Sequence, residues 1–422
     1  MKMPARVASP LPLAIGAAIG AAISTSCGAE PAPGSDVTLD IRREMVDGVE
    51  VVTIGPGSVW GAPAEVTEEL SIGQLEGPDE TMFAQIQDMA VDTGGGIYVF
   101  DSRIRELRYF DAEGDYIRTI GGEGGGPGEY GDVLLGLFLR SDGRLIARDM
   151  RNGRFNLYEP DGTASDTWRI PSGLFTSQAT LIRRDDHLYV KTLTGRVVEG
   201  EPWPFALLHV DAEGTVLDTI PYPELEDEPS ESNSIFMPSK VWTMSRAGDV
   251  IVGSSETYSF DIRRPDETVT RVEKEWTPVA VLPEERSQWQ ARLDWQARQI
   301  STLDYDPVPE TKPAYRGFYP GEDGTIWVHR HVASIPIDPT PPPEGNPNPP
   351  PPISYAEPNT FDAFEADGTY LGEVALPRGT RILVFTRDVL WGVRSGEFDE
   401  QYVVRLRVED PREMLESNPG DG

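Results

Sequence analysis

Short stretches that alternate between apolar and polar residues recur along the chain, and each one follows a tight turn rich in Gly or Asp. Six such segments carry the pattern: GGGIYVF (94–100), SDGRLIA (141–147), RDDHLYV (184–190), RAGDVIV (246–252), EDGTIWV (322–328) and TRDVLWG (386–392). Alternation with a period of two predicts β-strands that are buried on one side. The recurrence indicates one repeated structural unit rather than several unrelated domains.

Each segment continues into a hairpin, as in RELRYFDAEGDYIRTI (105–120), where a turn at 111–114 separates two further strands. A strand also precedes each opening turn, so every unit is a four-stranded antiparallel meander. Units of roughly 40 to 50 residues with four strands are the blades of β-propellers. We therefore predict an all-β fold, a six-bladed β-propeller that occupies residues 51–410.

The last unit contains only three predicted strands, at 381–385, 389–394 and 402–408. The segment EVTEELSI (65–72) lies outside the other units and has the alternation of a strand. If it supplied the missing outer strand, it would close the ring and cover an edge that would otherwise invite aggregation. We predict this closure by an N-terminal strand.

The first unit also carries motifs that extend beyond its strands. In residues 91–130 an aspartate follows the second strand, a D-x-x-G hairpin joins the third and fourth strands, and GEGGGPGEY leads to the next unit. This stretch resembles an NHL-type repeat. The resemblance is specific over the first unit and weakens along the chain. It implies a six-bladed propeller of the kind often found among bacterial lipoproteins, and it implies no particular chemistry.

Loop length distinguishes the two faces of the predicted disc. In an antiparallel meander the first-to-second and third-to-fourth turns lie on one face, and all other connections lie on the opposite face. Every turn of the first kind is short, whereas five longer segments fall on the other face, at 121–132, 194–204, 221–239, 276–313 and 331–359. Because loops carry function more often than tight turns do, this long-loop face is the predicted functional face.

Two of these long segments are insertions with a character of their own. Residues 276–313 contain PEERSQWQARLDWQARQI (283–300), which predicts an amphipathic helix because Trp289, Leu293 and Ile300 share one side. Residues 331–359 contain a proline-rich run at 341–352, which favours polyproline II. The two insertions could form a lid or collar over the central channel. Alternatively, the helix covers apolar surface and the proline-rich run is a disordered loop.

The N-terminus predicts export. Lys2 and Arg6 precede an apolar run at 7–23, and Cys27 follows small residues. This segment resembles the lipobox of bacterial lipoproteins, in which the cysteine takes the lipid, although Ser24 stands where Leu is usual. Residues 1–27 are thus predicted to be a signal peptide and Cys27 a lipidation site, with plain secretion as the alternative. Gly28 after the cysteine favours the outer membrane in a cell with two membranes.

The composition is typical of a protein outside the cytoplasm and excludes nucleic acid as a partner. The chain has 422 residues, 70 acidic against 37 basic side chains, and a single cysteine. A net charge of −33 would repel nucleic acid, and one cysteine allows no internal disulfide. We expect a monomer, with residues 28–50 as a flexible tether and N-terminal extension and residues 411–422 as a disordered tail.

Candidate binding residues are aromatic and arginine side chains on the long-loop face. Such residues dominate binding hot spots and stack on sugars or peptides, although in propellers a single tryptophan often only fills the space between blades. Arg103, Arg105, Arg151 and Arg154 fall near second-to-third turns, where they could bind an anion or a carboxylate. The residues predicted to bind a ligand or partner are Arg103, Arg105, Arg151, Arg154, Trp203, Tyr315 and Arg316, and Trp276 is a further aromatic residue of this face.

The sequence contains little that predicts catalysis. His329 and His331 are two apart on one strand, so both could point to one face as metal ligands, but they could equally be surface residues. No nucleophile elbow, calcium loop or phosphate loop is present, and no cofactor is expected. The GPGEYG segment (126–131) is interpreted as a link between blades because it precedes a strand rather than a helix.

Three functions remain open. The first is a lipid-anchored, extracytoplasmic propeller that binds an envelope protein or a small ligand on its long-loop face without catalysis. The second is a hydrolase or lyase with carboxylates or a metal at the channel mouth, which would need several His, Asp or Glu side chains to converge there. The third is a scaffold whose proline-rich loop docks an envelope partner.

Overall fold

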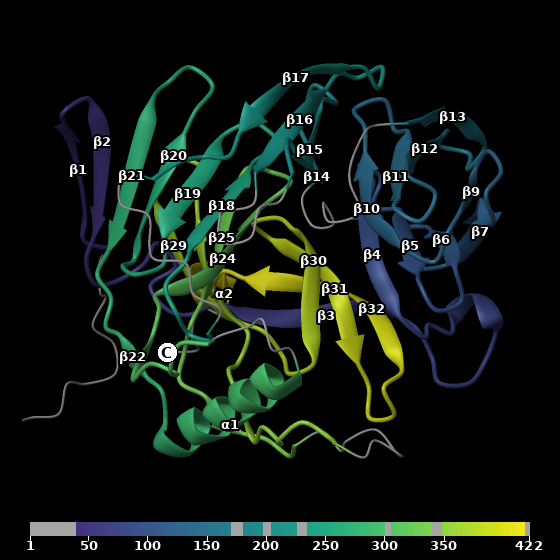
Figure 1. Cartoon of the computed structure of the whole chain (residues 1–422). Coiled ribbons are helices and arrows are strands. Elements are labelled where there is room, and N and C mark those ends of the chain that lie inside the picture. The colour runs from purple at the N-terminus through teal and green to yellow at the C-terminus, as the bar shows by residue number, and fades with distance from the viewer. Residues whose placement is uncertain are drawn as a thin grey trace, which may run out of the picture. The chain divides into compact units, whose positions relative to one another are not determined.

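Six mostly antiparallel sheets stand around a common axis, each with the first strand of its blade innermost (Figure 1). The computed structural model describes residues 39–169, 180–196, 204–225, 234–299, 305–339 and 348–417. The predicted all-β, six-bladed propeller is confirmed. In the described part of the chain, no helix is long and apolar enough to cross a membrane.

The first three blades have four strands each. These are β4 (Ile86–Val91), β5 (Ile97–Asp101), β6 (Glu106–Phe110) and β7 (Tyr116–Ile120) in blade 1; β10 (Leu134–Leu139), β11 (Leu145–Asp149), β12 (Arg154–Tyr158) and β13 (Ala164–Trp168) in blade 2; and β14 (Thr180–Ile182), β15 (Leu188–Leu193), β16 (Phe205–Val210) and β17 (Val216–Pro221) in blade 3.

Blades 4 to 6 depart from simple chain order. They contain β18 (Lys240–Met244), β19 (Val250–Ser254), β20 (Ser259–Arg263), β21 (Val269–Lys274), β2 (Val49–Ile54) and β1 (Ile41–Val46) in blade 4; β24 (Tyr315–Pro320), β25 (Ile326–Arg330), β28 (Thr360–Phe364) and β29 (Tyr370–Ala375) in blade 5; and β30 (Thr380–Phe385), β31 (Val389–Ser395), β32 (Gln401–Glu409) and β3 (Glu65–Ile72) in blade 6.

The remaining strands and helices lie in the connections outside the blade sheets and near the C-terminus. They are η1 (Asp79–Thr81), β8 (Gly122–Glu123), β9 (Glu129–Tyr130), β22 (Val279–Ala280), β23 (Thr311–Lys312), β26 (Ile335–Pro336), β27 (Tyr355–Ala356), α1 (Pro283–Gln299) and α2 (Pro411–Ser417).

The ring closes as the sequence predicts. Strand β3 pairs antiparallel with β32 along its whole length, from Glu65 opposite Glu409 to Ile72 opposite Val403. The side-chain oxygen of Gln401 then accepts a hydrogen bond from the backbone N–H of Ile86 at 2.6 Å, which links blade 6 to blade 1. The outer strand of the last blade is therefore supplied by the N-terminal part of the chain.

Aspartate and glycine make the tight turns. In blade 1, Asp92 Oδ1 accepts hydrogen bonds from the N–H groups of Gly94 at 2.8 Å and Gly96 at 2.9 Å, while Gly95 adopts φ +86°. A side-chain oxygen that caps the turn and a glycine that accepts positive φ together fix the hairpin. The longer connections all lie at the opposite ends of the strands, which agrees with the predicted long-loop face.

Buried apolar clusters fill five of the six seams between blades. Representative members are Phe100, Leu107, Leu134 and Leu145 between blades 1 and 2; Ile146, Phe155, Leu188 and Val210 between 2 and 3; Phe260, Val272, Phe318 and Ile326 between 4 and 5; Trp327, Phe361, Leu390 and Leu406 between 5 and 6; and Ile97, Phe110, Trp391 and Val403 between 6 and 1. Among the described residues, no such cluster joins blades 3 and 4.

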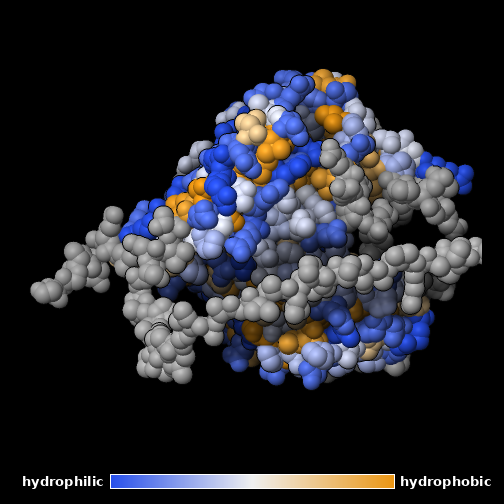
Figure 2. Space-filling view, turned by 90° about the vertical axis from the view of Figure 1, so that its left-hand side faces the viewer, coloured by the Kyte–Doolittle hydropathy of each residue, from blue (hydrophilic) through white to orange (hydrophobic). Residues whose placement is uncertain are grey.

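The prediction of a flexible tether and N-terminal extension at 28–50 is wrong about flexibility for residues 41–50. From Ile41 the chain forms β1 and β2, and β2 pairs in parallel with β21, so the ordered propeller begins before residue 51. The reason is burial, since Val52 and Ile54 are fully enclosed in the cluster between blades 4 and 5. The free edge of β1 carries charged side chains, and Figure 2, which faces this side of the molecule, shows a mostly hydrophilic surface with small separate hydrophobic patches. Residues 28–38 lie outside the described part.

The predicted disordered tail at 411–422 is also wrong in part, because Pro411–Ser417 form α2. Asp410 caps this helix by accepting a hydrogen bond from the N–H of Arg412 at 2.9 Å, and Pro411 suits the first helical position. Asp410 and Pro411 are thus a helix-start signal that the sequence contains. Residues 418–422 are outside the described part.

Candidate functional site: the groove between blades 3 and 4

The seam between blades 3 and 4 is held near the axis by a few aromatic rings. Tyr222 stacks against Phe205 at 6.2 Å and meets Trp242 of blade 4 at 4.9 Å between ring centroids. Lys191 Nζ lies 4.0 Å from the centroid of the Phe205 ring, and burial lowers the pKa of this lysine. Polar and aromatic groups thus replace the apolar core found at the other seams.

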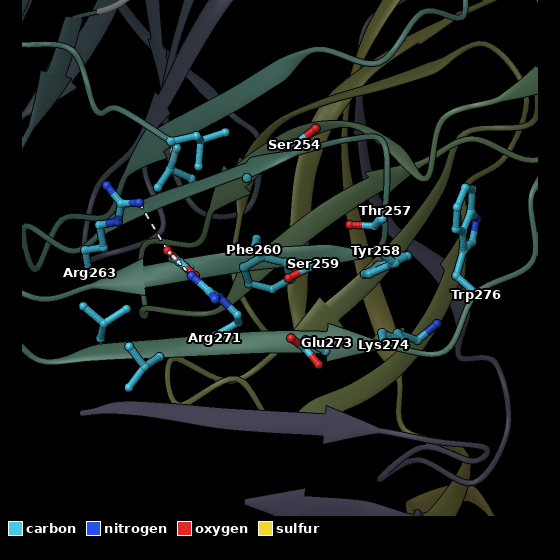
Figure 3. Close-up of a pocket in the computed structure, with 16 residues that line it drawn as sticks. Ser254, Thr257, Tyr258, Ser259, Phe260, Arg263, Arg271, Glu273, Lys274 and Trp276 are labelled. Carbon is cyan, nitrogen blue, oxygen red and sulfur yellow. Dashed lines mark hydrogen bonds and ion pairs between the residues drawn. The ribbon is translucent and has the colours of Figure 1, made fainter. Parts of the chain in front are cut away.

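A hollow of about 710 Å³ lies on the side of blade 4 that is turned toward this seam, and we call it the groove between blades 3 and 4. Its floor is the face of β19, β20 and β21 that is turned away from the blade 4–blade 5 core (Figure 3). Leu225 of the link that follows blade 3 also lines it. The volume lies within the roughly 300–1,000 Å³ typical of ligand sites. The groove ends beside Thr257 and Trp276, which belong to the long-loop face.

An aspartate between two arginines occupies the middle of the floor. Asp261 is buried and accepts hydrogen bonds from Arg271 Nε at 2.8 Å and from Arg263 Nη2 at 3.2 Å (Figure 3). Arg263 Nη1 also donates to the carbonyl oxygen of Glu224 at 2.8 Å. The carboxylate therefore orients both guanidinium groups, and one of them anchors the link that borders the groove.

Polar groups without internal partners line the end nearest the long-loop face. The Glu273 carboxylate is exposed and has no ion pair or hydrogen bond with another described residue, and the hydroxyls of Thr257 and Ser259 also have none. Trp276 is half-buried, because part of its ring packs on the blade 4–blade 5 cluster while the rest borders the groove. This end offers donors, acceptors and an aromatic surface to a ligand.

Tyr315, one of the predicted binding residues, supports the floor from behind. It is buried, and its hydroxyl lies 2.9 Å from the carbonyl oxygen of Ser254 and 2.8 Å from that of Ser259. Gly253 allows this approach, since a Cβ at that position would come within 2.4 Å of the tyrosine hydroxyl. Tyr315 is thus a positioning residue of the groove and does not touch a ligand.

Arg316, also predicted to bind, belongs to a separate charge cluster beside α1. Lys312 is fully buried, with its Nζ 3.2 Å from Glu285 of α1 and 3.1 Å from Glu357 of the proline-rich insertion. Glu357 also pairs with Arg316 and lies 3.0 Å from His331 Nδ1. Both insertions are fastened to blade 5 through this cluster. Helix α1 is packed on the propeller. Residues 340–347 of the proline-rich insertion lie outside the described part.

The two histidines predicted as metal ligands do not gather a ligand set. His329 stacks on Phe361 with 4.5 Å between ring centroids, while His331 engages Glu357. Burial, aided by the positive charge of Arg316, lowers the pKa of each histidine to about 3. Among the described residues no three His, Cys, Asp or Glu side chains come together as metal ligands. A cation beside His331 further disfavours a metal there.

The four arginines of blades 1 and 2 do not form one anion site. Arg103 and Arg151 are exposed on separate turns, and Arg105 pairs with Glu123 of the next link. Arg154 is buried and donates to the carbonyl oxygens of Gly125, Gly126 and Glu129, the last at 2.6 Å. It therefore holds the glycine-rich link in place. Trp203 and Cys27 lie outside the described residues.

A second, smaller cavity lies on the propeller axis. It has a volume of about 260 Å³ and is lined mainly by apolar residues from the inner strands of all six blades, including Met89, Leu139 and Leu383. Asp88 lines it as a half-buried acid, and desolvation raises the pKa of this carboxyl to about 6 in spite of hydrogen bonds from the N–H groups of Leu137 and Met89. The other carboxylate of the lining, Glu322, is held in an ion pair with Arg246.

The groove residues were missed in the sequence, although a signal was present. Strands β20 and β21 read SFDIR and VTRVEK, and place Asp261, Arg263, Arg271 and Glu273 on one face. Charged side chains at alternating positions of paired third and fourth strands mark a blade face that no apolar neighbour covers. Among the groove residues, Trp276 is the one that the sequence analysis names as an aromatic residue of the long-loop face.

Comparisons with known proteins agree on the fold. The model of the DUF5128 family, described as "6-bladed beta-propeller", matches residues 65–221, which cover the closing strand β3 and blades 1 to 3. The groove on blade 4 lies beyond this match. No curated protein matches the chain at a significant level.

Several solved structures resemble the chain at low identity. A putative exported protein from Bacteroides fragilis is 11% identical, with a TM-score of 0.48 over 85% of this chain and 99% of that one. A DUF4221 family member from Bacteroides vulgatus is 11% identical, with a TM-score of 0.45 over 82% and 99% of the two chains. Virginiamycin B lyase from Staphylococcus aureus is 10% identical, with a TM-score of 0.39 over 82% and 100%.

Proposed function

We propose that the protein is an extracytoplasmic binding propeller, held at a membrane by a lipid on Cys27, which takes a small ligand into the groove between blades 3 and 4. The observation that carries this proposal is the groove itself. The seam that lacks an apolar core among the described residues holds a cavity of about 710 Å³ with unpartnered polar groups. Protein interiors are close-packed, so a space between blades that binds nothing is usually filled by apolar side chains.

The floor of the groove is rigid, which favours binding of a ligand without a large rearrangement. Asp261 fixes the two arginines, Tyr315 fixes the strand ends behind the floor, and Arg263 fixes the neighbouring link. A preformed site loses little conformational entropy when a ligand binds. This is the geometry expected of a binding protein.

The alternative, a hydrolase or lyase at the channel mouth, requires acids or histidines that converge. In the part of the chain that the structure describes, the channel is lined by two carboxylates, Asp88 and Glu322, of which Glu322 is paired with Arg246, and no metal-ligand group is present. The observations therefore support binding as the proposed function. The proline-rich scaffold is not carried further, because residues 340–347 are not described.

Retention of small molecules tests the binding proposal. The mature protein, a Ser259→Trp variant that fills the groove, and a Thr268→Trp control on an exposed turn of the same blade would each be incubated with the low-mass fraction of an envelope extract. After washing and denaturation, mass spectrometry should find a compound released by the mature protein and the control but not by Ser259→Trp. Equal release from all three would contradict the assignment of the groove.

Localisation is tested separately. Cys27→Ala should move the protein from the membrane fraction to the soluble extracytoplasmic fraction, because a lipid supplies the anchor in this proposal. Retention of the variant in the membrane fraction would show that another feature holds the protein there. This result would leave the groove assignment intact.

A further inference from the structure

We infer that the ligand of the groove is an uncharged saccharide; this inference rests on the proposed function and adds the chemical class. The first reason is the charge balance of the lining. Arg263 and Arg271 both pair with Asp261, and Lys274 Nζ lies 3.2 Å from the buried Asp362. The lining also contains Glu273, so two carboxylates offset its two arginines while Lys274 is paired with Asp362, and the groove has no excess positive charge to neutralise an anion.

The second reason is the kind of polar group that is left over. Glu273 offers two carboxylate oxygens as acceptors, and Thr257 and Ser259 offer hydroxyls that both donate and accept. A carboxylate and hydroxyls side by side suit a ligand that presents several hydroxyl groups. A hydrocarbon ligand would instead leave these groups desolvated and unpaired.

The third reason is the aromatic surface at the end of the groove. Trp276 borders the cavity with part of its ring and is held by packing on the apolar cluster behind it (Figure 3). A fixed indole ring offers a flat apolar surface next to polar groups. The C–H face of a sugar ring stacks on such a surface while its hydroxyls reach Glu273 and Thr257.

The groove is also extended. Its floor follows β20 from Arg263 to Ser259, and strand geometry gives this segment a length of about 13 Å. Thr257 and Trp276 prolong the floor toward the long-loop face. A space of this length accommodates more than one sugar ring, so a short oligosaccharide is the expected ligand.

Isothermal titration of the mature chain with cellotriose, maltotriose, xylotriose and chitotriose tests the inference, with trigalacturonate as an anionic counterpart. At least one neutral trisaccharide should bind with a Kd below about 1 mM, and tryptophan fluorescence should change on binding. Glu273→Gln should weaken that binding at least tenfold, whereas Glu256→Gln, an exposed acid nearby that does not line the groove, should leave it unchanged. Both variants should melt as the parent does, since neither carboxylate has a described partner.

Three results would overturn the inference. They are binding of trigalacturonate in preference to the neutral sugars, equal binding by parent and Glu273→Gln, and no binding of any trisaccharide. The retention experiment separates these failures from failure of the proposed function. A retained compound that is not a saccharide, and that Ser259→Trp loses, would contradict the ligand class and keep the groove as the site. No retained compound and no bound sugar would overturn both.

Discussion

Lys312 illustrates how single charges organise the long-loop face. Its ammonium group is fully buried and contacts Glu285, Glu357 and the hydroxyl of Ser334, the last at 2.7 Å. Burial lowers the pKa of Lys312, while Glu285 acts in the opposite direction. One lysine thus joins helix α1 and the proline-rich insertion to the propeller.

Removal of that lysine should be costly. Lys312→Met keeps most of the side-chain volume but leaves Glu285 and Glu357 buried without their shared cation, which should lower the free energy of unfolding by about 3–5 kcal/mol. Urea titration followed by circular dichroism would measure the loss. The control is Arg286→Met on the same helix, whose pair with Glu310 is exposed and should be worth at most about 1 kcal/mol. Similar losses for both variants would contradict the role assigned to Lys312.

His329 gives the protein a defined sensitivity to acid. Its pKa falls to about 3, so between about pH 6.5 and pH 3 the unfolded chain binds a proton that the folded chain does not. Stability contributed by the neutral histidine is therefore lost as pH decreases through this range. Asp88, whose folded-state pKa is raised to about 6, acts in the opposite direction because its protonation favours the folded state below that pH.

A variant isolates the histidine contribution. His329→Phe retains a ring against Phe361 and removes both the titrating group and a buried Nε2 that has no described partner. The difference in unfolding free energy between variant and parent should shift in favour of the variant by up to about 2 kcal/mol from pH 6.5 to pH 5. Urea titrations at both pH values measure it. A constant difference would show that His329 titrates in the folded protein with the same pKa as in the unfolded chain.

At the scale of elements, the β1–β2 hairpin is part of the core rather than an appendage. Ile54→Ala should lower the free energy of unfolding by about 2–5 kcal/mol, because Ile54 of β2 is completely buried in the blade 4–blade 5 cluster. Met45→Ala on β1 should change stability by less than about 0.5 kcal/mol, since Met45 is 68% exposed. Thermal unfolding compares the two variants. A small effect of Ile54→Ala would mean that the hairpin detaches without loss to the propeller.

The sequence predicts those elements whose pattern is local. The closing strand at Glu65–Ile72 has the predicted bounds, and α1 begins at the predicted Pro283. Turn residues and period-two alternation contain the information for these elements. The parallel pairing of β2 with β21 joins positions some 220 residues apart, as Glu50 and Thr270 show, and no local pattern encodes such a pairing.

The candidate site was less predictable for a related reason. The sequence predicts that loop arginines and aromatic residues bind the ligand. In the structure, Arg154 instead holds the glycine-rich link in place, and Tyr315 supports the floor of the groove. The groove depends on which blade face is left uncovered. That depends on the packing of blade 3 against blade 4, which no single strand sequence reveals.

At the scale of the whole molecule, the propeller is closed but unequal around its ring. Five seams are apolar, and the family match at 65–221 ends with blade 3, just before the polar seam. Blade 4 is the six-stranded blade, widened by β1 and β2, and its third and fourth strands form the groove floor.

The most direct test of the account is hydrogen–deuterium exchange of the mature protein with and without the low-mass fraction of an envelope extract. If the groove is the ligand site, exchange should slow in peptides that cover 254–276 and remain unchanged in peptides that cover the arginine-bearing turns at 101–105 and 149–154. Protection of those turns or of the axial cavity around Asp88, without protection of 254–276, would contradict the account.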